Sequence, residues 1–465
     1  MVDQPTIESF KSGFRGAVIA RGDADYQSAR KVYNGMIDRS PALVARCADV
    51  ADVKAALRFG HEQNLLVAVR GGGHNGGGLG TCDDGLVIDL SMMKGTRVDP
   101  EAKTVRVGGG CTWGDVDHAT HAFGMATPSG FISTTGVGGL TLGGGIGYLS
   151  RRYGLTIDNL LEADVVLADG RVVTASPSKN EDLFWAIRGG GGNFGIVTSF
   201  LFRLHNVNMV TGGPMLWPLE AAGDVMRFYR DFIGKASEEL NGFFAMMTVP
   251  PAPPFPAELH MKKMCAIVWC HTGPAAEAEA ALGPVRRFRR PAFEFIGQLP
   301  FPVIQSLFDA LYPPGLQWYW KADFVTTLSD GLIEAHVDHG SRVPTMHSTM
   351  HMYPIDGAVH RVGRTATAFP FREANWAQVI VGVDPNPAAK DSIVSWARAY
   401  YEATHPFGLG GAYVNFMMED DQERVRASYR ENYDRLVTIK THYDPENVFR
   451  VNQNIRPGAT RAAGV

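Results

Sequence analysis

Apolar and polar positions in the first part of the chain change period several times, and this pattern predicts a mixed region of helices and strands. Apolar side chains recur with helical spacing over residues 49–63, and Asp49 is placed to cap that helix. Short strand-like segments follow at residues 65–69, 86–90 and 104–110, with glycine or polar residues between them.

A hairpin and a helix–strand unit complete this first region. Residues 162–176 (EADVVLADGRVVTAS) have strand-forming side chains on both sides of Asp169-Gly170, and Asp-Gly is a strong signal for a hairpin turn. Residues 181–204 then indicate a helix, a glycine loop and a strand.

The pattern changes again after about His205. From residue 209 to about 401, strand-like segments alternate with amphipathic helices, which predicts one sheet with helices on a face. In the last segment we expect a strand over residues 411–417 (GAYVNFM) and a long helix over about 420–443. The predicted domains are therefore residues 1–208, 209–405 and 406–465.

Glycine is the one residue type whose distribution is unusual. Of 53 glycines, 29 fall between Gly71 and Gly195, and the rest of the chain has ordinary glycine usage. Glycine lets the main chain approach a ligand closely and turn its N–H groups toward an anion. Several such loops in one region favour a long anionic ligand, such as a dinucleotide, held by backbone.

The commonest dinucleotide and nucleotide motifs do not explain these loops. Gly71-x-Gly73-x-x-Gly76 matches the spacing of the Rossmann fingerprint and follows a strand, and Asp89 lies at a suitable distance. That fingerprint needs a helix immediately after it, whereas a loop and a strand are expected here. A Rossmann NAD site is therefore improbable, and the loops contain no GK[ST] of a P-loop.

Charge and cysteine usage narrow the class of protein further. The formal net charge of −4 gives no electrostatic footprint for nucleic acid or for an anionic membrane surface. Five scattered cysteines form no metal-binding spacing, so we expect buried thiols in a reducing compartment and no metal site. Without a secretory signal or a long apolar run, the expected location is cytoplasmic.

His74 stands in the middle of the first glycine loop, VRGGGHNGGG. An exposed loop histidine is the more common interpretation for any one histidine, and a functional role is the alternative because such loops often carry sites. No second ligand lies at metal-binding spacing around it. A base, a nucleophile and a covalent tether all remain open for this side chain.

At this point the residues resemble a known family. VRGGGHNGGG, GFISTTGVGGLTLGGGIG, DNLLEADVVLADG, DLFWAIRGGGGNFGIVT, AYVNF and YDPENVFRVNQNI occur in the order found in berberine bridge enzyme-like FAD-linked oxidases, of the vanillyl-alcohol oxidase (PCMH-type) flavoprotein superfamily. The resemblance covers the chain from about Ser40 to Pro457. It implies an α+β fold: a PCMH-type FAD-binding domain of two α+β subdomains, and a substrate domain whose antiparallel sheet is covered by helices. The C-terminal segment would return to the flavin.

The resemblance also implies roles for individual residues. His74 would be the covalent anchor, bonded to the 8α-methyl group of FAD. Family precedent places the cofactor against Arg70, Gly71, Gly72, Gly73, Asn75, Gly76, Ser129, Gly130, Thr134, Thr135, Gly138, Gly139, Gly143, Gly192, Asn193, Val197, Tyr413, Asn415 and Asn452. Loop N–H groups and Ser129 would hold the pyrophosphate.

Four positions depart from the family pattern. Members with two covalent links carry a cysteine where this chain has Ile132, so a single histidyl link and no cysteinyl link is predicted. Plant members have a tyrosine and a Gln or Glu at positions that correspond to Ile146 and Ile380, and their FPHR motif reads FPFR here, with Phe371. The usual acid–base set is thus incomplete.

Candidate catalytic residues come from two predicted strands. Tyr413 and Asn415 alternate on one strand and so face the same way, and a tyrosine from this segment often acts as base in the family. In TMHSTMHMY, His347, Thr349, His351 and Tyr353 share one face, which makes His351 a second base candidate and His347 a weaker one. A buried core tyrosine and a solvated sheet face are the competing interpretations. WYW at residues 318–320 could supply an aromatic wall or only core.

Together these features predict an FAD-dependent oxidase that takes hydride from an alcohol, amine or sugar and passes electrons to O₂, with Thr135 at the position associated with oxygen access. A tailoring oxidoreductase of a secondary metabolite, such as an oxidative cyclase or dehydrogenase, is one alternative, and a flavin-carrying binding protein without turnover is another. The partner is a small molecule, with neither nucleic acid nor membrane. The sequence leaves the substrate and the oligomeric state open.

Overall fold

The computed structural model describes residues 2–459. The first part of the chain forms a four-stranded sheet in the order β1-β2-β4-β3, in which β2, β4 and β3 run parallel. The elements are α1 (Gln4–Ser12), β1 (Ala17–Ala20), α2 (Tyr26–Ala29), β2 (Leu43–Arg46), α3 (Val50–Glu62), β3 (Val67–Arg70) and β4 (Leu86–Asp89). The expected capping of α3 is confirmed, since the Asp49 carboxylate accepts hydrogen bonds from the backbone N–H groups of Ala51 and Asp52.

A second, antiparallel sheet follows in the order β5-β6-β10-β8-β9. Its strands and helices are β5 (Thr96–Asp99), β6 (Thr104–Gly108), α4 (Trp113–His121), α5 (Val137–Leu142), α6 (Ser150–Tyr153), β8 (Leu160–Val166), β9 (Val172–Ala175), α7 (Glu181–Ile187) and β10 (Ile196–Arg203). The Asp169-Gly170 hairpin is confirmed, and Gly170 has the positive φ of 79° that this turn needs. A short ladder pairs β7 (Met125–Ala126) with β11 (His205–Asn206).

The third sheet has eight strands and belongs to the region after residue 208. Its path is β15-β12-β14-β13-β18-β19-β17, with β16 paired to β12. The strands are β12 (Met209–Pro218), β13 (Leu240–Thr248), β14 (Lys263–His271), β15 (Phe293–Glu294), β16 (Gly297–Pro300), β17 (Gln317–Val325), β18 (Thr349–Pro354) and β19 (Trp376–Asp384). As predicted, this is an antiparallel sheet.

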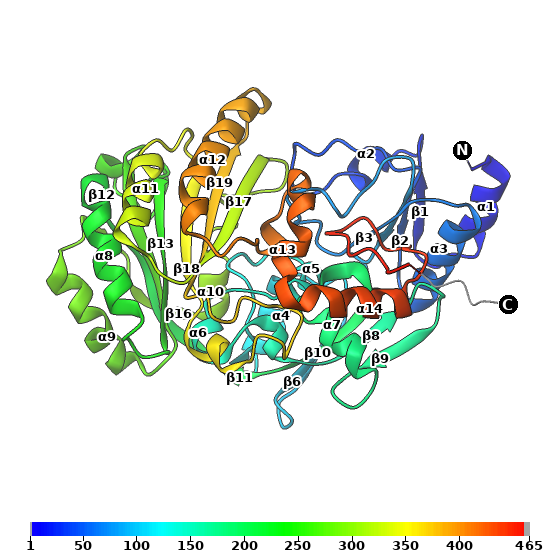
Figure 1. Cartoon of the computed structure of the whole chain (residues 1–465), viewed down its shortest axis with the longest axis horizontal. Helices are drawn as coiled ribbons and strands as arrows, with labels where there is room; N and C mark the ends of the chain where they lie inside the picture. The colour runs from blue at the N-terminus through cyan, green and yellow to red at the C-terminus, as the bar shows by residue number, and fades with distance from the viewer. Residues whose placement is uncertain (1, 460–465) are drawn as a thin grey trace.

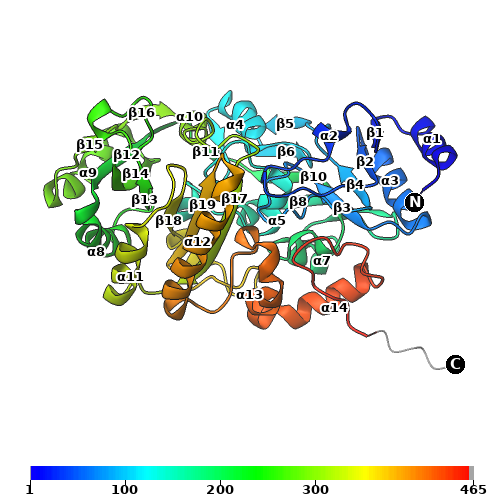
Figure 2. The same ribbon diagram turned by 90° about the horizontal axis from the view of Figure 1, so that it is seen from above.

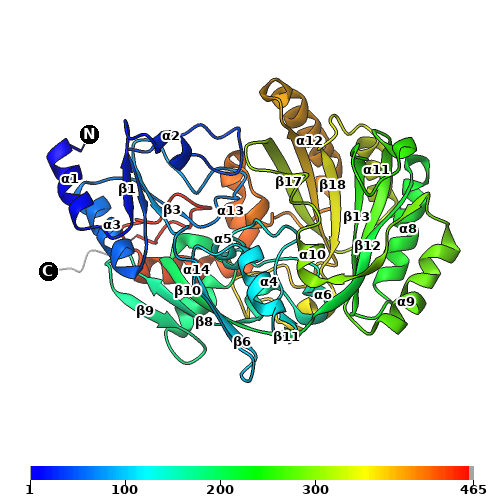
Figure 3. The ribbon, with the colours of Figure 1, turned by 180° about the vertical axis from the view of Figure 1, so that it is seen from behind.

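Helices cover this large sheet on one face, as Figures 1 and 2 show. They are α8 (Ala222–Ile233), α9 (Ala275–Phe288), α11 (Asp330–Gly340) and α12 (Lys390–Thr404). Seen from behind in Figure 3, α10 (Phe301–Gln305), α4 and α5 lie between the two halves of the molecule. The face of the large sheet that these four helices leave uncovered is directed toward the glycine-rich region.

Two details of the predicted strands are wrong. GAYVNFM is not a strand: its backbone is extended at Tyr413 and then forms one 3₁₀ turn, η8 (Val414–Phe416). Strand β18 begins only at Thr349, so His347 lies before it and not on its face. Neither segment has a strand partner that would extend the ladder to these residues.

The long C-terminal helix is also interrupted. It consists of η9 (Glu419–Arg424), α13 (Val425–Tyr429), η10 (Arg430–Asn432) and α14 (Tyr433–Tyr443). The interruption falls at Arg430, whose φ of 48° is incompatible with a continuous right-handed helix. The break lets α14 turn and pack against α7 of the second sheet's domain.

All five cysteines are buried free thiols, as expected. Over residues 2–459, none of the helices has the length and apolar character needed to cross a membrane.

Candidate functional site

One cavity of about 320 Å³ lies where the three sheets and the C-terminal segment meet. The glycine loops line it from one side. Strands β17, β18 and β19 line it from the other, together with residues of the segments around Tyr413 and Asn452. The cavity thus joins the cofactor half and the substrate half that the sequence pattern separates.

Backbone contact between the first two glycine loops explains part of the glycine excess. A Cβ added to Gly72 would lie 2.5 Å from the backbone nitrogen of Gly136, and Gly136 is crowded by Gly72 in the same way. Such distances do not occur between real Cβ atoms and backbone, so neither position admits a side chain. The two loops therefore form one continuous wall of main chain.

Two glycines show that this wall suits a long ligand. In the described chain, a Cβ at Gly139 or Gly192 would have no neighbour within 4 Å, and both residues line the cavity. Their bare backbone thus leaves a cradle that a side chain would fill. Among residues 2–459, Arg70 is the only Lys, Arg, Asp or Glu on the lining, and its guanidinium is engaged by Asp89 at 2.7 Å. A ligand with a pyrophosphate would be held here by N–H groups.

His74 lies on the lining of the cavity. Its Nε2 is 3.2 Å from the Oγ1 of Thr134, and its ring stacks on Tyr33 with 3.6 Å between the ring centroids. Burial lowers the pKa of His74 to about 3, so the imidazole is neutral at physiological pH. A neutral, oriented imidazole has a nitrogen lone pair available for bonding to a ligand.

Tyr413 and Asn415 meet in the cavity although they do not share a strand. The Tyr413 hydroxyl oxygen accepts hydrogen bonds from the Asn415 Nδ2 at 2.9 Å and from the backbone N–H of Gly145 at 2.8 Å. Gly143 leaves the space that the Asn415 side chain occupies. Burial raises the pKa of Tyr413 to about 12 despite these two donors, so the phenol keeps its proton at neutral pH.

His351 and Tyr353 form a second polar pair on the lining. The Nδ1 of His351 is 2.6 Å from the Tyr353 hydroxyl, and Tyr353 stacks on Phe131 with 4.4 Å between centroids. Burial lowers the pKa of His351 to about 3, which keeps this imidazole neutral. The predicted division of the strand is confirmed within β18: Thr349, His351 and Tyr353 line the cavity and Met350 does not.

Aromatic side chains make the remaining wall. Trp318 and Trp320 line the cavity from β17, and Tyr312 and Phe416 extend this surface. The WYW motif is therefore a cavity wall at its two tryptophans. Trp320 also covers Gly76, whose Cβ would lie 2.6 Å from the indole Nε1.

Comparison with known proteins agrees with this site. Residues 41–176 match a family model described as FAD binding domain, and residues 412–456 match one described as Berberine and berberine like. An FAD-linked oxidoreductase from Dictyostelium discoideum is 31% identical over 97% of this chain and 97% of its own length. The chain is a member of the berberine bridge enzyme-like family of FAD-linked oxidoreductases.

Solved structures show the same fold. The 6-hydroxy-D-nicotine oxidase from Arthrobacter nicotinovorans has a TM-score of 0.86 and 25% identity, covering 98% of this chain and 100% of that one. Glucooligosaccharide oxidase from Acremonium strictum, which carries a 6-S-cysteinyl, 8α-N1-histidyl FAD, has a TM-score of 0.86 and 22% identity over 98% of this chain and 100% of that one. This berberine bridge enzyme-like protein is thus an FAD-dependent oxidoreductase with a PCMH-type fold.

Most residues to which the family resemblance assigns the cofactor line the cavity, and the structure also shows which do not. Those on the lining are Arg70, Gly71, Gly72, Gly73, His74, Asn75, Gly130, Thr135, Gly138, Gly139, Gly192, Val197, Tyr413, Asn415 and Asn452. Those outside it are Gly76, Ser129, Thr134, Gly143 and Asn193.

The residues outside the lining support those on it. Ser129 is buried, and its hydroxyl contacts the Nε2 of Gln305, so it does not face the cavity. Asn193 is fully buried and donates to the carbonyl oxygens of Gly190 and Gln453 at 2.9 and 3.1 Å. Thr134 reaches the site only through His74.

The four departures from the family pattern lie in different places, and Phe371 is not on the lining. Ile132 and Ile146 line the cavity. The lining is therefore apolar at the two positions where the family pattern has a cysteine and a tyrosine, respectively. Ile380 does not line it, whereas its neighbours Val379 and Val381 do, because side chains alternate along β19. The position that faces the cavity is therefore Val379 or Val381, and it is apolar in either case.

Sequence reasoning missed several residues of this site. Tyr33 stacks on His74, and Tyr312, Phe416 and Gln453 line the cavity. Tyr33 and Tyr312 belong to none of the motifs quoted above. Phe416 and Gln453 lie within AYVNF and YDPENVFRVNQNI, beside Asn415 and Asn452, and these motifs were the usable signal.

Proposed function

We propose that this berberine bridge enzyme-like protein is an oxidase whose FAD is covalently attached through His74 alone. The observation that carries the proposal is the convergence of His74, Tyr413 and His351 on one cavity with a main-chain wall. The apolar Ile132 supports a single link, because it offers no thiol. The domain boundaries near residues 208 and 405 belong to the same proposal.

The chain's own groups supply the acid–base chemistry. FAD, when bound, supplies the acceptor for the hydride of a substrate C–H bond. His351 is the proposed base for the proton of the adjacent O–H or N–H, because its neutral imidazole lines the cavity; its pKa, lowered to about 3 by burial, has to rise when substrate binds. Tyr413, with its pKa of about 12, stays protonated and orients the substrate through its hydroxyl, while Asn415 fixes that hydroxyl.

The walls favour a neutral, flat substrate. Trp318, Trp320, Tyr312 and Phe131 offer aromatic surfaces, and the β17–β19 side of the lining carries no Lys, Arg, Asp or Glu in the described residues. A sugar would call for more amide and charged groups. An aromatic alcohol or amine fits best, which also keeps a tailoring oxidoreductase of a secondary metabolite as a second candidate function. O₂ is the proposed final acceptor, with Thr135 on the lining near its route.

The covalent link is tested without any substrate. Acid precipitation of the purified protein should give a yellow pellet, because a covalent flavin stays with the denatured chain. His74→Ala should give a colourless pellet and a yellow supernatant after FAD is added back. A colourless pellet from the unaltered protein contradicts the link.

The oxidase proposal is tested with a peroxide-coupled screen of aromatic alcohols, amines, sugars and phenolics. We expect an aromatic alcohol or amine to bleach the flavin anaerobically and air to restore the colour at once. A flavin that stays bleached for minutes in air indicates a dehydrogenase. Failure of every compound to bleach it indicates a binding protein without turnover.

The choice of base is tested on the best substrate of that screen. His351→Gln should lower kcat/KM by roughly 10²-fold or more, the usual worth of a general base. Tyr413→Phe should lower kcat/KM less and leave its dependence on pH unchanged. The reverse order of effects would make Tyr413 the base.

A further inference from the structure

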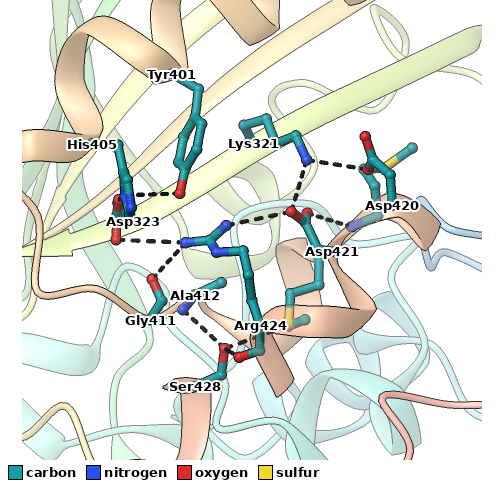
Figure 4. Close-up of polar contacts among 12 residues, drawn as sticks. Lys321, Asp323, Tyr401, His405, Gly411, Ala412, Asp420, Asp421, Arg424 and Ser428 are labelled. Carbon is teal, nitrogen blue, oxygen red and sulfur yellow. Dashed lines mark hydrogen bonds and ion pairs between the residues drawn. The ribbon is translucent and has the colours of Figure 1, made fainter. Parts of the chain in front are cut away.

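A cluster of charged residues, drawn in Figure 4, lies on the opposite side of strand β17 from the tryptophans that line the cavity. Strand β17 separates the two: Trp318 and Trp320 line the cavity, and Lys321 and Asp323 alternate with them and project from the other face. The cluster also draws on α12, on the 3₁₀ turn η7 (His405–Phe407) and on η9. It therefore links the substrate sheet to the C-terminal segment.

Arg424 is the residue on which the cluster converges. Its Nη1 is 3.4 Å from an oxygen of Asp421 and its Nη2 is 3.9 Å from an oxygen of Asp323, and its guanidinium lies over the ring of Tyr401 at 5.0 Å from the centroid. The side chain is 15% exposed. Few solvent molecules therefore compete for these contacts, and they are stronger than surface ion pairs.

The carboxylates that face Arg424 are themselves held in place. Asp421 accepts a hydrogen bond from Lys321 at 2.7 Å and caps η9 through the backbone N–H of Met418 at 3.1 Å. Asp323 is fully buried and pairs with the Nδ1 of His405. The two carboxylates that contact Arg424 are thus each held by further hydrogen bonds, to Lys321 and Met418 for Asp421 and to His405 for Asp323.

Arg424 also holds the chain immediately before Tyr413. Its Nη2 donates to the carbonyl oxygen of Gly411 at 2.9 Å. Its own carbonyl oxygen accepts a hydrogen bond from the Ser428 hydroxyl at 2.9 Å, and that hydroxyl accepts the backbone N–H of Ala412 at 3.0 Å. Residues 411 and 412 are therefore fixed from the arginine's side chain and main chain together.

We propose that Arg424 is a positioning residue that sets the location of Tyr413 and Asn415 in the cavity. Its contacts fix the two peptide groups before Tyr413, and the hydroxyl of Tyr413 is fixed at its other end by Gly145 and Asn415. The inference rests on the proposed function, in which Tyr413 contacts the substrate. Arg424 itself touches neither substrate nor cofactor, because it lies behind the wall that β17 forms.

The test compares Arg424→Gln with Arg426→Gln in the holoenzyme. Arg426 lies two residues further on, is 68% exposed and contacts the exposed Asp434 and the ring of Tyr433, so it is a matched control on the surface. Arg424→Gln should lower kcat at least ten-fold, while the flavin stays in the acid-precipitated pellet and Arg426→Gln leaves kcat unchanged. Arg424→Lys, which keeps the charge, should recover part of kcat.

A double variant separates positioning from general destabilisation. Because Arg424 acts through Tyr413, Arg424→Gln combined with Tyr413→Phe should be no slower than Tyr413→Phe alone. If the fold-losses in kcat of the two single variants multiply in the double variant, the proposal is wrong. If Arg424→Gln does not fold, Ser428→Ala takes its place in the same cycle: it keeps the Arg424 side chain and removes the hydroxyl that bonds Ala412, the Arg424 carbonyl oxygen and the Met417 sulfur.

Hydrogen exchange distinguishes failure of this inference from failure of the proposed function. Amides of residues 411–417 should exchange faster in Arg424→Gln than in Arg426→Gln, whatever the protein's substrate is. Faster exchange with no effect of Tyr413→Phe on turnover would refute the role of Tyr413. Unchanged exchange would refute the role of Arg424.

Discussion

Gly139 shows how a single residue without a side chain shapes this site. It lies within α5, where glycine is unfavourable for helix stability, yet it lines the cavity with open space above its Cα. We expect Gly139→Leu to fill the cradle and to lower the flavin absorbance per protein to a small fraction of the unaltered value. The folded chain without FAD should be as stable as before, or more stable, because leucine favours helices.

The matched control for that substitution is Gly234→Leu. Gly234 is exposed, has helical φ and ψ at the end of α8, and has equally open space around a Cβ. This variant should bind FAD fully. Normal FAD content in Gly139→Leu would show that the cofactor does not pass over this residue.

Asp117 in α4 makes stability depend on pH with an unusual sign. Burial raises the pKa of its carboxyl group to about 7, so the folded protein binds its proton more tightly than the unfolded chain does. The contribution of Asp117 to the free energy of unfolding is most favourable near pH 4 and is lost as pH rises through 7. Each unit by which its folded pKa exceeds its unfolded pKa corresponds to about 1.4 kcal/mol. Asp117→Asn should therefore raise the melting temperature at pH 8 and have little effect at pH 4.

Asp115 in the same helix provides the control for pH. Burial would raise the pKa of Asp115, which caps this helix, but hydrogen bonds with Thr112 and the ion pair with Lys94 together lower it. Its contribution is present above its unfolded pKa and is lost in acid, so Asp115→Asn should destabilise more at pH 8 than at pH 4. If the stability changes caused by Asp117→Asn and Asp115→Asn vary with pH in the same direction, the opposite pKa shifts assigned to the two carboxyl groups are wrong.

At the scale of elements, α14 stabilises the third glycine loop through one buried ion pair. Lys440 and Asp444 have fully buried side chains 2.6 Å apart. The lysine ammonium also donates to the carbonyl oxygens of Asn193 and Phe449, each at 2.8 Å. Helix α14 thereby joins the loop of Gly192 to the segment that carries Asn452, and both line the cavity.

We expect Lys440→Met to lower the free energy of unfolding by about 3–5 kcal/mol, because it leaves a buried carboxylate unpaired. Urea unfolding measures this loss. Lys440→Met combined with Asp444→Asn should lose less, since the amide is uncharged and its oxygen can still accept the backbone N–H of Phe449. Arg342→Met, in an exposed pair of the same spacing, should change stability by less than about 1 kcal/mol.

At the scale of the whole molecule, Gly76 lies at one of the contacts between the two halves. The loop that contains His74 touches Trp320 of the large sheet there, with no room for a Cβ. Gly76→Ala would push Trp320 into the cavity and should cost about 1–3 kcal/mol, while raising KM for the best substrate. Thermal unfolding and steady-state kinetics measure the two effects.

Trp320→Phe tests whether Gly76 acts through the indole. The smaller ring leaves space for the new methyl group, so Gly76→Ala should be nearly neutral in that background. An undiminished loss of stability in the double variant would point to the backbone of the loop instead.

Local patterns predicted most elements correctly because their causes are local. The cap of α3, the Asp169-Gly170 turn and the outward and inward faces of β18 follow from periodicity and turn chemistry. The strand over residues 411–417 was wrong, because no neighbouring strand pairs with it. The continuous helix to Tyr443 was wrong because the chain breaks at Arg430 to reach α7.

The sequence by itself determined the family, the glycine loops and the histidine among them, because motif spacing and composition are properties of the chain. The tertiary structure decided which side chains meet. Tyr33 reaches His74, and Tyr413 reaches Gly145 across 268 positions, through packing between distant segments. It also decided that Val379 and Val381, and not Ile380, face the cavity, because a shift of one residue turns a strand's side chain to the opposite face.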